Sequence, residues 1–394
     1  MTKLRAYFDH NATAPVRPEA AAAIARALML TGNPSSVHAE GRRARQMVEE
    51  ARAHVAALVH AKPAEIVFTS CGTEAANLAL HSAKSALGIE RLIVSAIEHD
   101  CVRASAAALG LPVTELPVDT CGVADLSVLA KLLEAPGKPL VALMLANNET
   151  GAVQPIAEAA VLTHHAGGLL LVDAVQAAGR MSVEFDGLGA DMLFVSAHKI
   201  GGPQGAGALV VRTGLAFEPL IRGGGQEARR RAGTENVAAL AGFGVAARLA
   251  REDVHEMSRL ADLRDALEHA LREVAPDLVI FGEDAPRLAN TSLFAASGLD
   301  AETLIMALDL DGLAVSSGSA CSSGKVARSH VLAAMKVDDA LAKATIRVSL
   351  GSGNTREEVD RLVASWSRVL KRTRDKMKSA KTGADASALA EVEH

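Results

Sequence analysis

Short apolar runs that alternate with helix-like segments between about residues 39 and 250 constrain the fold more than any other feature of this sequence. Apolar residues at positions 44, 47, 48, 51, 55 and 58 follow the spacing of one helix face. The strand-like runs are apolar at successive positions, as expected of strands that are covered on both faces. This alternation predicts an α/β domain with a mainly parallel sheet. The predicted strands are Ile66–Thr69, Leu92–Ser95, Leu140–Leu145, Leu169–Val172, Met192–Ser196 and Ala208–Val211.

The pattern changes after about residue 252, where a long charged helix is predicted over Asp253–Val274. A helix over Ala301–Leu310 and short strands at 279–281, 290–294 and 314–316 indicate a smaller α+β domain that the N-terminal segment joins. We therefore expect a large domain over 15–255 and a small domain made of 1–14 and 256–375. Residues 376–394 have few large apolar groups and are expected to be a disordered tail.

Composition excludes several classes of protein. The formal net charge of −5 argues against a nucleic-acid partner. The chain has no apolar run near the roughly 20 residues that a membrane span needs, and its start lacks the apolar core of a signal peptide, so a cytoplasmic protein is expected. The cysteines form no C-x-x-C pair, which argues against a metal site or a disulfide framework. They are Cys71, Cys101, Cys121 and Cys321.

Polar residues follow the predicted strands at the edge where open α/β sheets bind ligands. Asp173 ends one strand, and Lys199 follows the next. Pyridoxal 5'-phosphate (PLP) needs such a pair, because a lysine amine binds its aldehyde and a carboxylate keeps its pyridine nitrogen protonated. The turn Ser70–Thr73 opens a helix and offers N–H groups to the phosphate, and Ser196 and His198 could add donors.

Five longer motifs occur in a fixed order along residues 6–370. They are Tyr7–Thr13, Asn33–His38, Ser196–Gly205, Arg231–Asn236 and Ser316–Cys321. With them the sequence resembles the cysteine desulfurases of the NifS/IscS type, in the aminotransferase class V group of PLP fold-type I enzymes. The resemblance implies a large domain with a mainly parallel sheet of the seven-stranded type and a smaller α+β domain.

The resemblance also implies a role for individual residues. Lys199 would bind the cofactor covalently, and His99 would stack on its ring and move protons. Thr234 would reach the phosphate from a second subunit, which implies a homodimer. The remaining cofactor-binding residues would be Gly72, Thr73, Asp173, Gln176, Ser196 and His198, and the substrate carboxylate would meet Asn11, Asn148 and Arg347.

Cys321 distinguishes a desulfurase from a transaminase. It lies in a Ser- and Gly-rich stretch that is typical of a mobile loop. Its thiolate would attack the sulfur of L-cysteine, which leaves L-alanine and a persulfide on Cys321. We therefore expect an L-cysteine desulfurase that donates sulfur to an acceptor protein such as an iron–sulfur scaffold.

Other hypotheses remain open at this point. A selenocysteine lyase, or another PLP-dependent lyase or transaminase, would share the fold and the cofactor. A non-catalytic binding protein or a thiol hydrolase would leave Lys199 and Asp173 unexplained. His10 is assigned no role, and the adjacent histidines His164 and His165 are interpreted as a solvated turn rather than a metal pair. Cys71 and Gln204 depart from the glycine and lysine that are common in the family.

Overall fold

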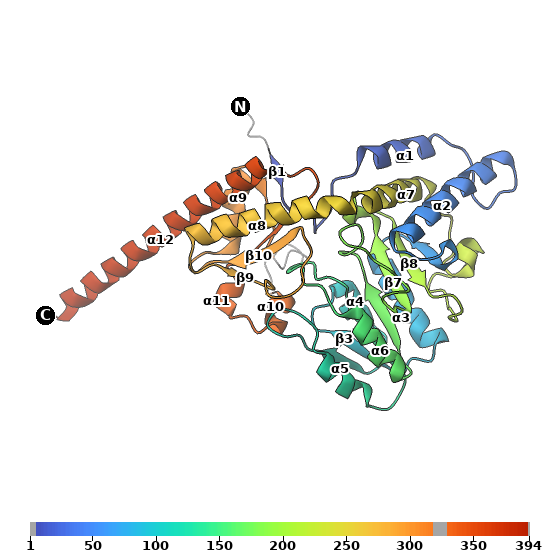
Figure 1. The fold of residues 1–394 in the computed structure, drawn as a ribbon, viewed down its shortest axis with the longest axis horizontal. Coiled ribbons are helices and arrows are strands. Elements are labelled where there is room, and N and C mark those ends of the chain that lie inside the picture. Colours follow the sequence, from blue (N-terminus) through green and yellow to red (C-terminus); the bar gives the residue numbers. More distant parts are fainter. Residues whose placement is uncertain (1–4, 318–328, 393–394) are drawn as a thin grey trace.

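The computed structural model describes residues 5–317 and 329–392, which form two packed parts (Figure 1). The larger part contains a seven-stranded sheet, and the smaller part contains two short sheets. Every strand of the large sheet runs parallel to its neighbours except β8, which is antiparallel to both β2 and β7. The strand order is β2 (Ile66–Thr69), β8 (Gly207–Val211), β7 (Met192–Ser196), β6 (Leu169–Asp173), β5 (Pro139–Ala142), β3 (Arg91–Ser95) and β4 (Val113–Leu116).

Helices cover both faces of the large sheet, which is why its strands are apolar at successive positions. In β7, Leu193 and Val195 enter one core, whereas Met192 and Phe194 enter the core on the opposite face. The first core includes residues of α2 (Ala39–Leu58), α5 (Leu126–Leu133), α6 (Ile156–His165) and α7 (Val237–Glu252). The second includes residues of α3 (Gly72–Ala86) and α4 (Asp100–Ala108), and α1 (Pro18–Leu28) packs on α7.

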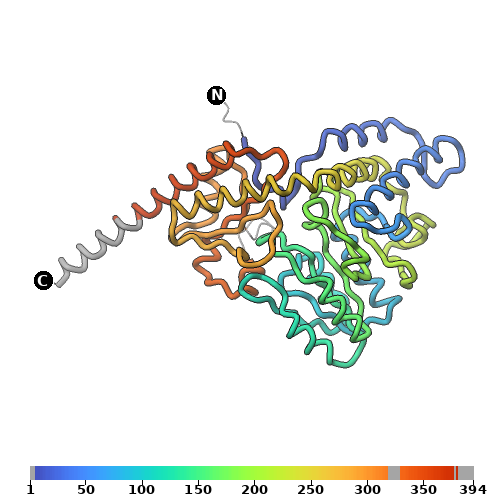
Figure 2. The backbone as a smooth tube through the Cα atoms, viewed as in Figure 1, coloured from blue at the N-terminus to red at the C-terminus, as the bar shows by residue number. Residues whose placement is uncertain are grey.

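The smaller part is built around β10 (Thr291–Ala295), which pairs antiparallel with β9 (Val279–Ile280) and with β12 (Ile346–Ser349). The N-terminal strand β1 (Ala6–Tyr7) pairs with β11 (Leu313–Ala314), and the blue N-terminal segment accordingly lies against the orange and red small domain in Figure 2. The remaining helices are α8 (Met257–Val274), α9 (Ala301–Leu310), α10 (His330–Ala334), α11 (Asp339–Ala342) and α12 (Arg356–Val392).

Most of the predicted elements are confirmed, and the fold class is the expected one. His164 and His165 are exposed as expected, but they form the last turn of α6 instead of a separate turn, and His164 Nε2 lies 2.8 Å from Asp191 Oδ2. Ala6 and Phe8 share a core cluster with residues of the small domain. The exact domain boundaries and the disorder of residues 376–394 stay predictions, although α12 runs to Val392. No helix among the described residues has the length and apolarity of a membrane span.

The small domain has a testable aromatic contact in its core. Phe294 is 2% exposed and meets Trp366 edge to face, with 6.2 Å between the ring centroids. We expect Phe294→Ala to lower the free energy of unfolding by about 3 kcal/mol, because it removes buried area and leaves a cavity. Urea denaturation followed by the fluorescence of Trp366, the chain's only tryptophan, measures this loss. Leu310→Ala, at a side chain that is 81% exposed, is the control, and equal losses would contradict the prediction.

Candidate active site

Lys199 lies directly beyond β7, in a 3-10 turn that spans Ala197–Lys199. Its Nζ donates hydrogen bonds to Asn11 O at 2.6 Å and to Ala12 O at 2.8 Å. These carbonyls belong to the N-terminal segment that crosses from the small domain to the large one. The amine is therefore held at the junction of the domains, at the carboxyl edge of the sheet.

Asp173 ends β6, the strand that pairs in parallel with β7. Its Oδ1 accepts a hydrogen bond of 2.8 Å from Val175 N, and the residue is buried. Burial raises the pKa of Asp173 to about 6, and the positive charge of Lys199 opposes that rise. The predicted acid and amine are thus electrostatic neighbours at adjacent strand ends.

A second buried acid lies beside this pair. Glu98 Oε1 accepts a hydrogen bond from Met144 N, and Oε2 is buried without a hydrogen-bond partner among the described residues. Burial and the charge of Asp173 both raise the pKa of Glu98 well above its usual range. The buried surroundings of Glu98 therefore favour its neutral, protonated form.

His99 caps the N-terminus of α4. Its Nδ1 accepts a hydrogen bond of 3.1 Å from Cys101 N, so the proton of the neutral ring lies on Nε2. Burial lowers the pKa of His99, and the charge of Lys199 lowers it further. The imidazole is therefore neutral at neutral pH and close to the lysine.

The start of α3 forms a turn with free N–H groups. Glu74 N donates to Cys71 Sγ and Ala75 N donates to Cys71 O, whereas no acceptor in the described part of the chain takes the N–H of Gly72 or Thr73. A carbon added to Gly72 would lie 3.4 Å from Val175 Cγ2 and 3.7 Å from Ser196 Cβ. The turn therefore adjoins the ends of β6 and β7, and its N–H groups suit an anion such as a phosphate.

Gln176 and His198 also reach the N-terminal segment. Gln176 Nε2 donates to Asn11 O at 3.0 Å, and His198 Nδ1 lies 3.2 Å from Thr13 Oγ1. Burial, together with the charges of Lys199 and Arg180, lowers the pKa of His198 to about 4. Thr234 is different, because it is exposed and no hydrogen bond among the described residues joins it to this cluster. Its predicted place is across a subunit boundary.

Arg347 in β12 lies on the small-domain side of the site. Its Nη2 forms a 2.6 Å ion pair with Asp9 Oδ1, and its Nη1 donates to Asn148 O at 3.0 Å. Asn11 Nδ2 donates to the same carbonyl at 3.1 Å. Arg347 Nε is buried and has no hydrogen-bond partner among the described residues, so the guanidinium keeps a donor for an anionic ligand.

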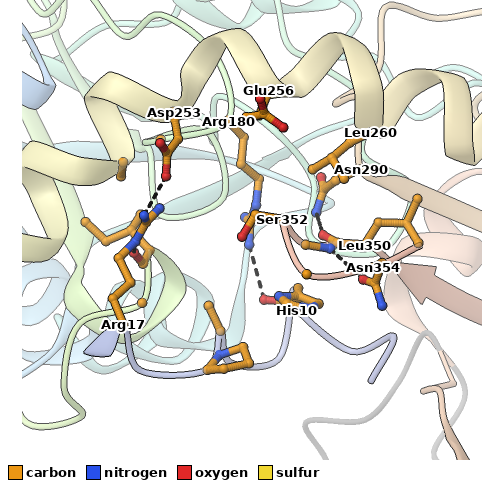
Figure 3. Close-up of a pocket in the computed structure, with 18 of the residues that line it drawn as sticks. His10, Arg17, Arg180, Asp253, Glu256, Leu260, Asn290, Leu350, Ser352 and Asn354 are labelled. Atoms are coloured by element: carbon orange, nitrogen blue, oxygen red, sulfur yellow. Dashed lines mark hydrogen bonds and ion pairs between the residues drawn. The ribbon is translucent and has the colours of Figure 1, made fainter. Parts of the chain in front are cut away.

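Sequence reasoning missed Arg180, whose guanidinium contacts the backbone carbonyl of Lys199. It donates to Gln176 O at 2.8 Å, to His10 O at 3.2 Å and to Lys199 O at 3.4 Å. Arg180 and His10 line a cavity of about 500 Å³ between the domains (Figure 3). Burial and the charge of Arg180 lower the pKa of His10 to about 4. The four-residue spacing from Gln176 was the only sequence signal, because it places both side chains on one face of a helical turn.

Asp9 and Glu149 were also missed. Asp9 lies inside the Tyr7–Thr13 motif, and the sequence assigned it no role, yet it orients Arg347. Glu149 is buried, and its Oε2 accepts a 2.6 Å hydrogen bond from Ser329 Oγ. Cys321, the predicted sulfur carrier, lies outside the described residues.

The chain matches the family described as Aminotransferase class-V over residues 6–362, and it belongs to that family. It is 44% identical to a cysteine desulfurase of Cereibacter sphaeroides over 366 residues, 91% of this chain and 94% of the relative. It is 39% identical to a cysteine desulfurase IscS of Dictyoglomus turgidum, over 94% of this chain and 96% of the relative. A solved NifS-like protein from Rickettsia africae is 34% identical, covers 93% of this chain and 99% of its own, and has a TM-score of 0.86.

These comparisons confirm both the predicted resemblance and the predicted fold class. They also confirm that the chain is an enzyme of the cysteine desulfurase class. Members of this class use PLP. The roles of the individual residues stay predictions.

Glu149 makes a pH dependence testable. Burial raises its pKa to about 7, although Ser329 and the charge of Arg347 oppose the rise. The folded chain then keeps a proton that the unfolded chain releases, so the stability from this group is present below about pH 4.5 and is lost toward about pH 7. Relative to wild type, Glu149→Gln should gain roughly 2–3 kcal/mol of unfolding free energy across that window.

Urea denaturation at several pH values measures the difference between Glu149→Gln and wild type. Glu134→Gln, at an exposed glutamate, is the matched control and should show a difference that does not change with pH. A pH-independent difference for Glu149→Gln as well would show that Glu149 ionises as it does in the unfolded chain.

Proposed function

We propose that this chain is a PLP-dependent L-cysteine desulfurase in which Lys199 binds the cofactor. The observation that carries the proposal is the convergence of Asp173 and Lys199 at the ends of the paired strands β6 and β7. A buried carboxylate and an amine at one sheet edge match the two groups that the pyridine nitrogen and the aldehyde of PLP require.

The residues around this pair fit the rest of the cofactor. Gly72 and Thr73 offer N–H groups to the phosphate, and Ser196 beside that turn is a further candidate donor. The family resemblance adds His198 as another candidate donor. The family resemblance makes Gln176 the candidate partner of the ring oxygen, and hydrogen bonds with Asn11 O and Arg180 hold its amide in place. When bound, PLP supplies an electron-accepting ring that assists cleavage of the carbon–sulfur bond.

His99 and Lys199 are the candidate proton carriers. The neutral imidazole of His99 holds its proton on Nε2, and burial keeps it from taking a second proton at neutral pH. Lys199 is near enough for its charge to influence that imidazole. A neutral base beside a cationic amine suits the movement of a proton to and from the α-carbon side of a substrate.

Arg347, Asn148 and Asn11 are the candidate residues for the substrate carboxylate. A guanidinium fork matches a carboxylate, and Asp9 fixes one edge of that fork. Arg347 and Asn11 both donate to the backbone carbonyl of Asn148, which holds their side chains close together. Substrate would therefore bind between the N-terminal segment and β12.

Sulfur transfer would need Cys321. Its thiolate would attack the sulfur of L-cysteine, a sulfur–sulfur bond would form, and the carbon–sulfur bond would break. The electron pair of the broken bond would stay with the carbon skeleton, which takes up a proton and leaves as L-alanine. The persulfide on Cys321 would then pass to an acceptor protein.

We further propose a cytoplasmic homodimer in which Thr234 reaches the phosphate of the second subunit. An iron–sulfur scaffold is the proposed acceptor, as the family resemblance implies. The relatives are cysteine desulfurases, so the selenocysteine lyase and transaminase alternatives are not favoured.

Release of alanine and sulfide from L-cysteine in the presence of a thiol reductant tests the proposal. Wild type should be yellow and yield both products, and Cys321→Ala should stay yellow and yield almost none. Lys199→Ala should lose the covalently bound chromophore as well as the activity. Full activity in Cys321→Ala would show that Cys321 is not the sulfur carrier and that the enzyme acts as a direct lyase.

Asp9 gives a second test, because it orients Arg347 without being expected to contact the substrate. Asp9→Asn should raise KM for L-cysteine by about tenfold, which corresponds to about 1.4 kcal/mol, and change kcat less. Steady-state kinetics measure the split between KM and kcat. Asp309→Asn, which breaks an exposed pair with Arg5, is the control and should leave KM unchanged. An unchanged KM in Asp9→Asn would contradict the proposal that Arg347 binds the substrate.

A further inference from the structure

A run of left-handed backbone follows the glycine-rich stretch 223–225. Glu227 has φ 47° and ψ 40°, Ala228 has φ 52° and ψ 40°, and Arg229 has φ 66°. None of these residues is glycine, and each such conformation costs on the order of 1 kcal/mol. Consecutive strained residues persist only where their surroundings hold them in place.

A buried ion pair holds this turn against β2. The side chain of Glu227 is 1% exposed, and Arg52 of α2 donates Nη1 and Nη2 to its two carboxylate oxygens, each at 2.8 Å. Phe68 N donates to the same carboxylate at 2.8 Å, and Arg52 Nη1 also donates to Ile66 O at 3.1 Å. Arg230 Nη2 adds hydrogen bonds to Ala64 O and Ile66 O. The turn is therefore attached to the first and third residues of the strand and to Ala64 before it.

The same turn reaches the start of α3. Arg231 Nε donates to Glu74 Oε1 at 2.7 Å, and Glu74 Oε2 accepts a hydrogen bond of 2.8 Å from Ser70 N. Ser70 begins the turn whose Gly72 and Thr73 N–H groups have no acceptor in the described part of the chain. One carboxylate thus connects the strained segment to the anion-binding turn.

We propose that Arg52, Glu227 and Arg231 are positioning residues that set the Ser70–Thr73 turn for the phosphate of the cofactor. This inference rests on the proposed function, which places PLP at Lys199. The ion pair of Glu227 with Arg52 fixes the left-handed turn, and that turn orients the Arg231 side chain. Arg231 in turn orients the Glu74 carboxylate, which accepts the hydrogen bond from Ser70 N. The strained segment and the turn that it orders are far apart in the sequence.

Two ligands separate this role from ordinary stabilisation. The cofactor-free full chain is titrated with PLP and, separately, with pyridoxal, which has the aldehyde and ring but no phosphate. Bound ligand is followed by its absorption on Lys199. Glu227→Gln and Arg231→Met should each weaken PLP binding by at least tenfold and change pyridoxal binding by less than twofold.

Equal losses for the two ligands, or no loss for either, would overturn the positioning role. Glu218→Gln, which breaks an exposed pair with Arg222, is the matched control and should leave both affinities unchanged. Circular dichroism checks folding, and Arg231→Met carries the test alone if Glu227→Gln does not fold. A wild-type chain that binds neither ligand would overturn the proposed function and, with it, this inference.

A double-mutant cycle tests whether Glu227 acts through Arg231. If Glu227 acts by aiming Arg231, Glu227→Gln combined with Arg231→Met should weaken PLP binding no more than about twofold beyond the stronger single variant. Fold losses that multiply fully would show that the two residues act independently, which would overturn the proposed route.

Discussion

The parallel pairing of β6 with β7 is the constraint on which the site depends. Parallel strands end at the same edge of a sheet, so Asp173 and the turn to Lys199 must lie together once those strands pair. The start of α3 joins them, because β2 lies two strands away and its loop passes beside Ser196. The proposed cofactor site is therefore a consequence of strand order.

The N-terminal segment completes the site from the other side. Asp9 binds Arg347, the carbonyls of Asn11 and Ala12 accept from Lys199, and Thr13 contacts His198. These contacts reach both domains, so the segment sets the distance between the cofactor edge of the large domain and the guanidinium of the small one. A few buried hydrogen bonds thereby set whether one substrate can contact the large-domain edge and the Arg347 guanidinium at the same time.

Desolvation controls the electrostatics of this region. Burial raises the pKa of Asp173 to about 6 and that of Glu149 to about 7, and it lowers the pKa of His10 and His198 to about 4. At neutral pH Asp173 is therefore mostly ionised, Glu149 is only partly ionised, and both imidazoles are neutral. The charges that remain are concentrated on a few groups, chiefly cations such as Lys199, Arg180 and Arg347. A region with excess positive charge suits a cofactor phosphate and a substrate carboxylate.

The sequence by itself determined the sheet, its covered faces, the Asp173–Lys199 pair and the family, because apolar runs and continuous motifs are local signals. It missed β4, an edge strand whose first three residues are exposed and which therefore lacks an apolar run. Only the tertiary structure decided the roles of Asp9 with Arg347 and of Arg52 with Glu227, whose partners lie 338 and 175 positions apart. Such pairs leave no local pattern, since their geometry arises only when distant segments pack and exclude water from the charges between them.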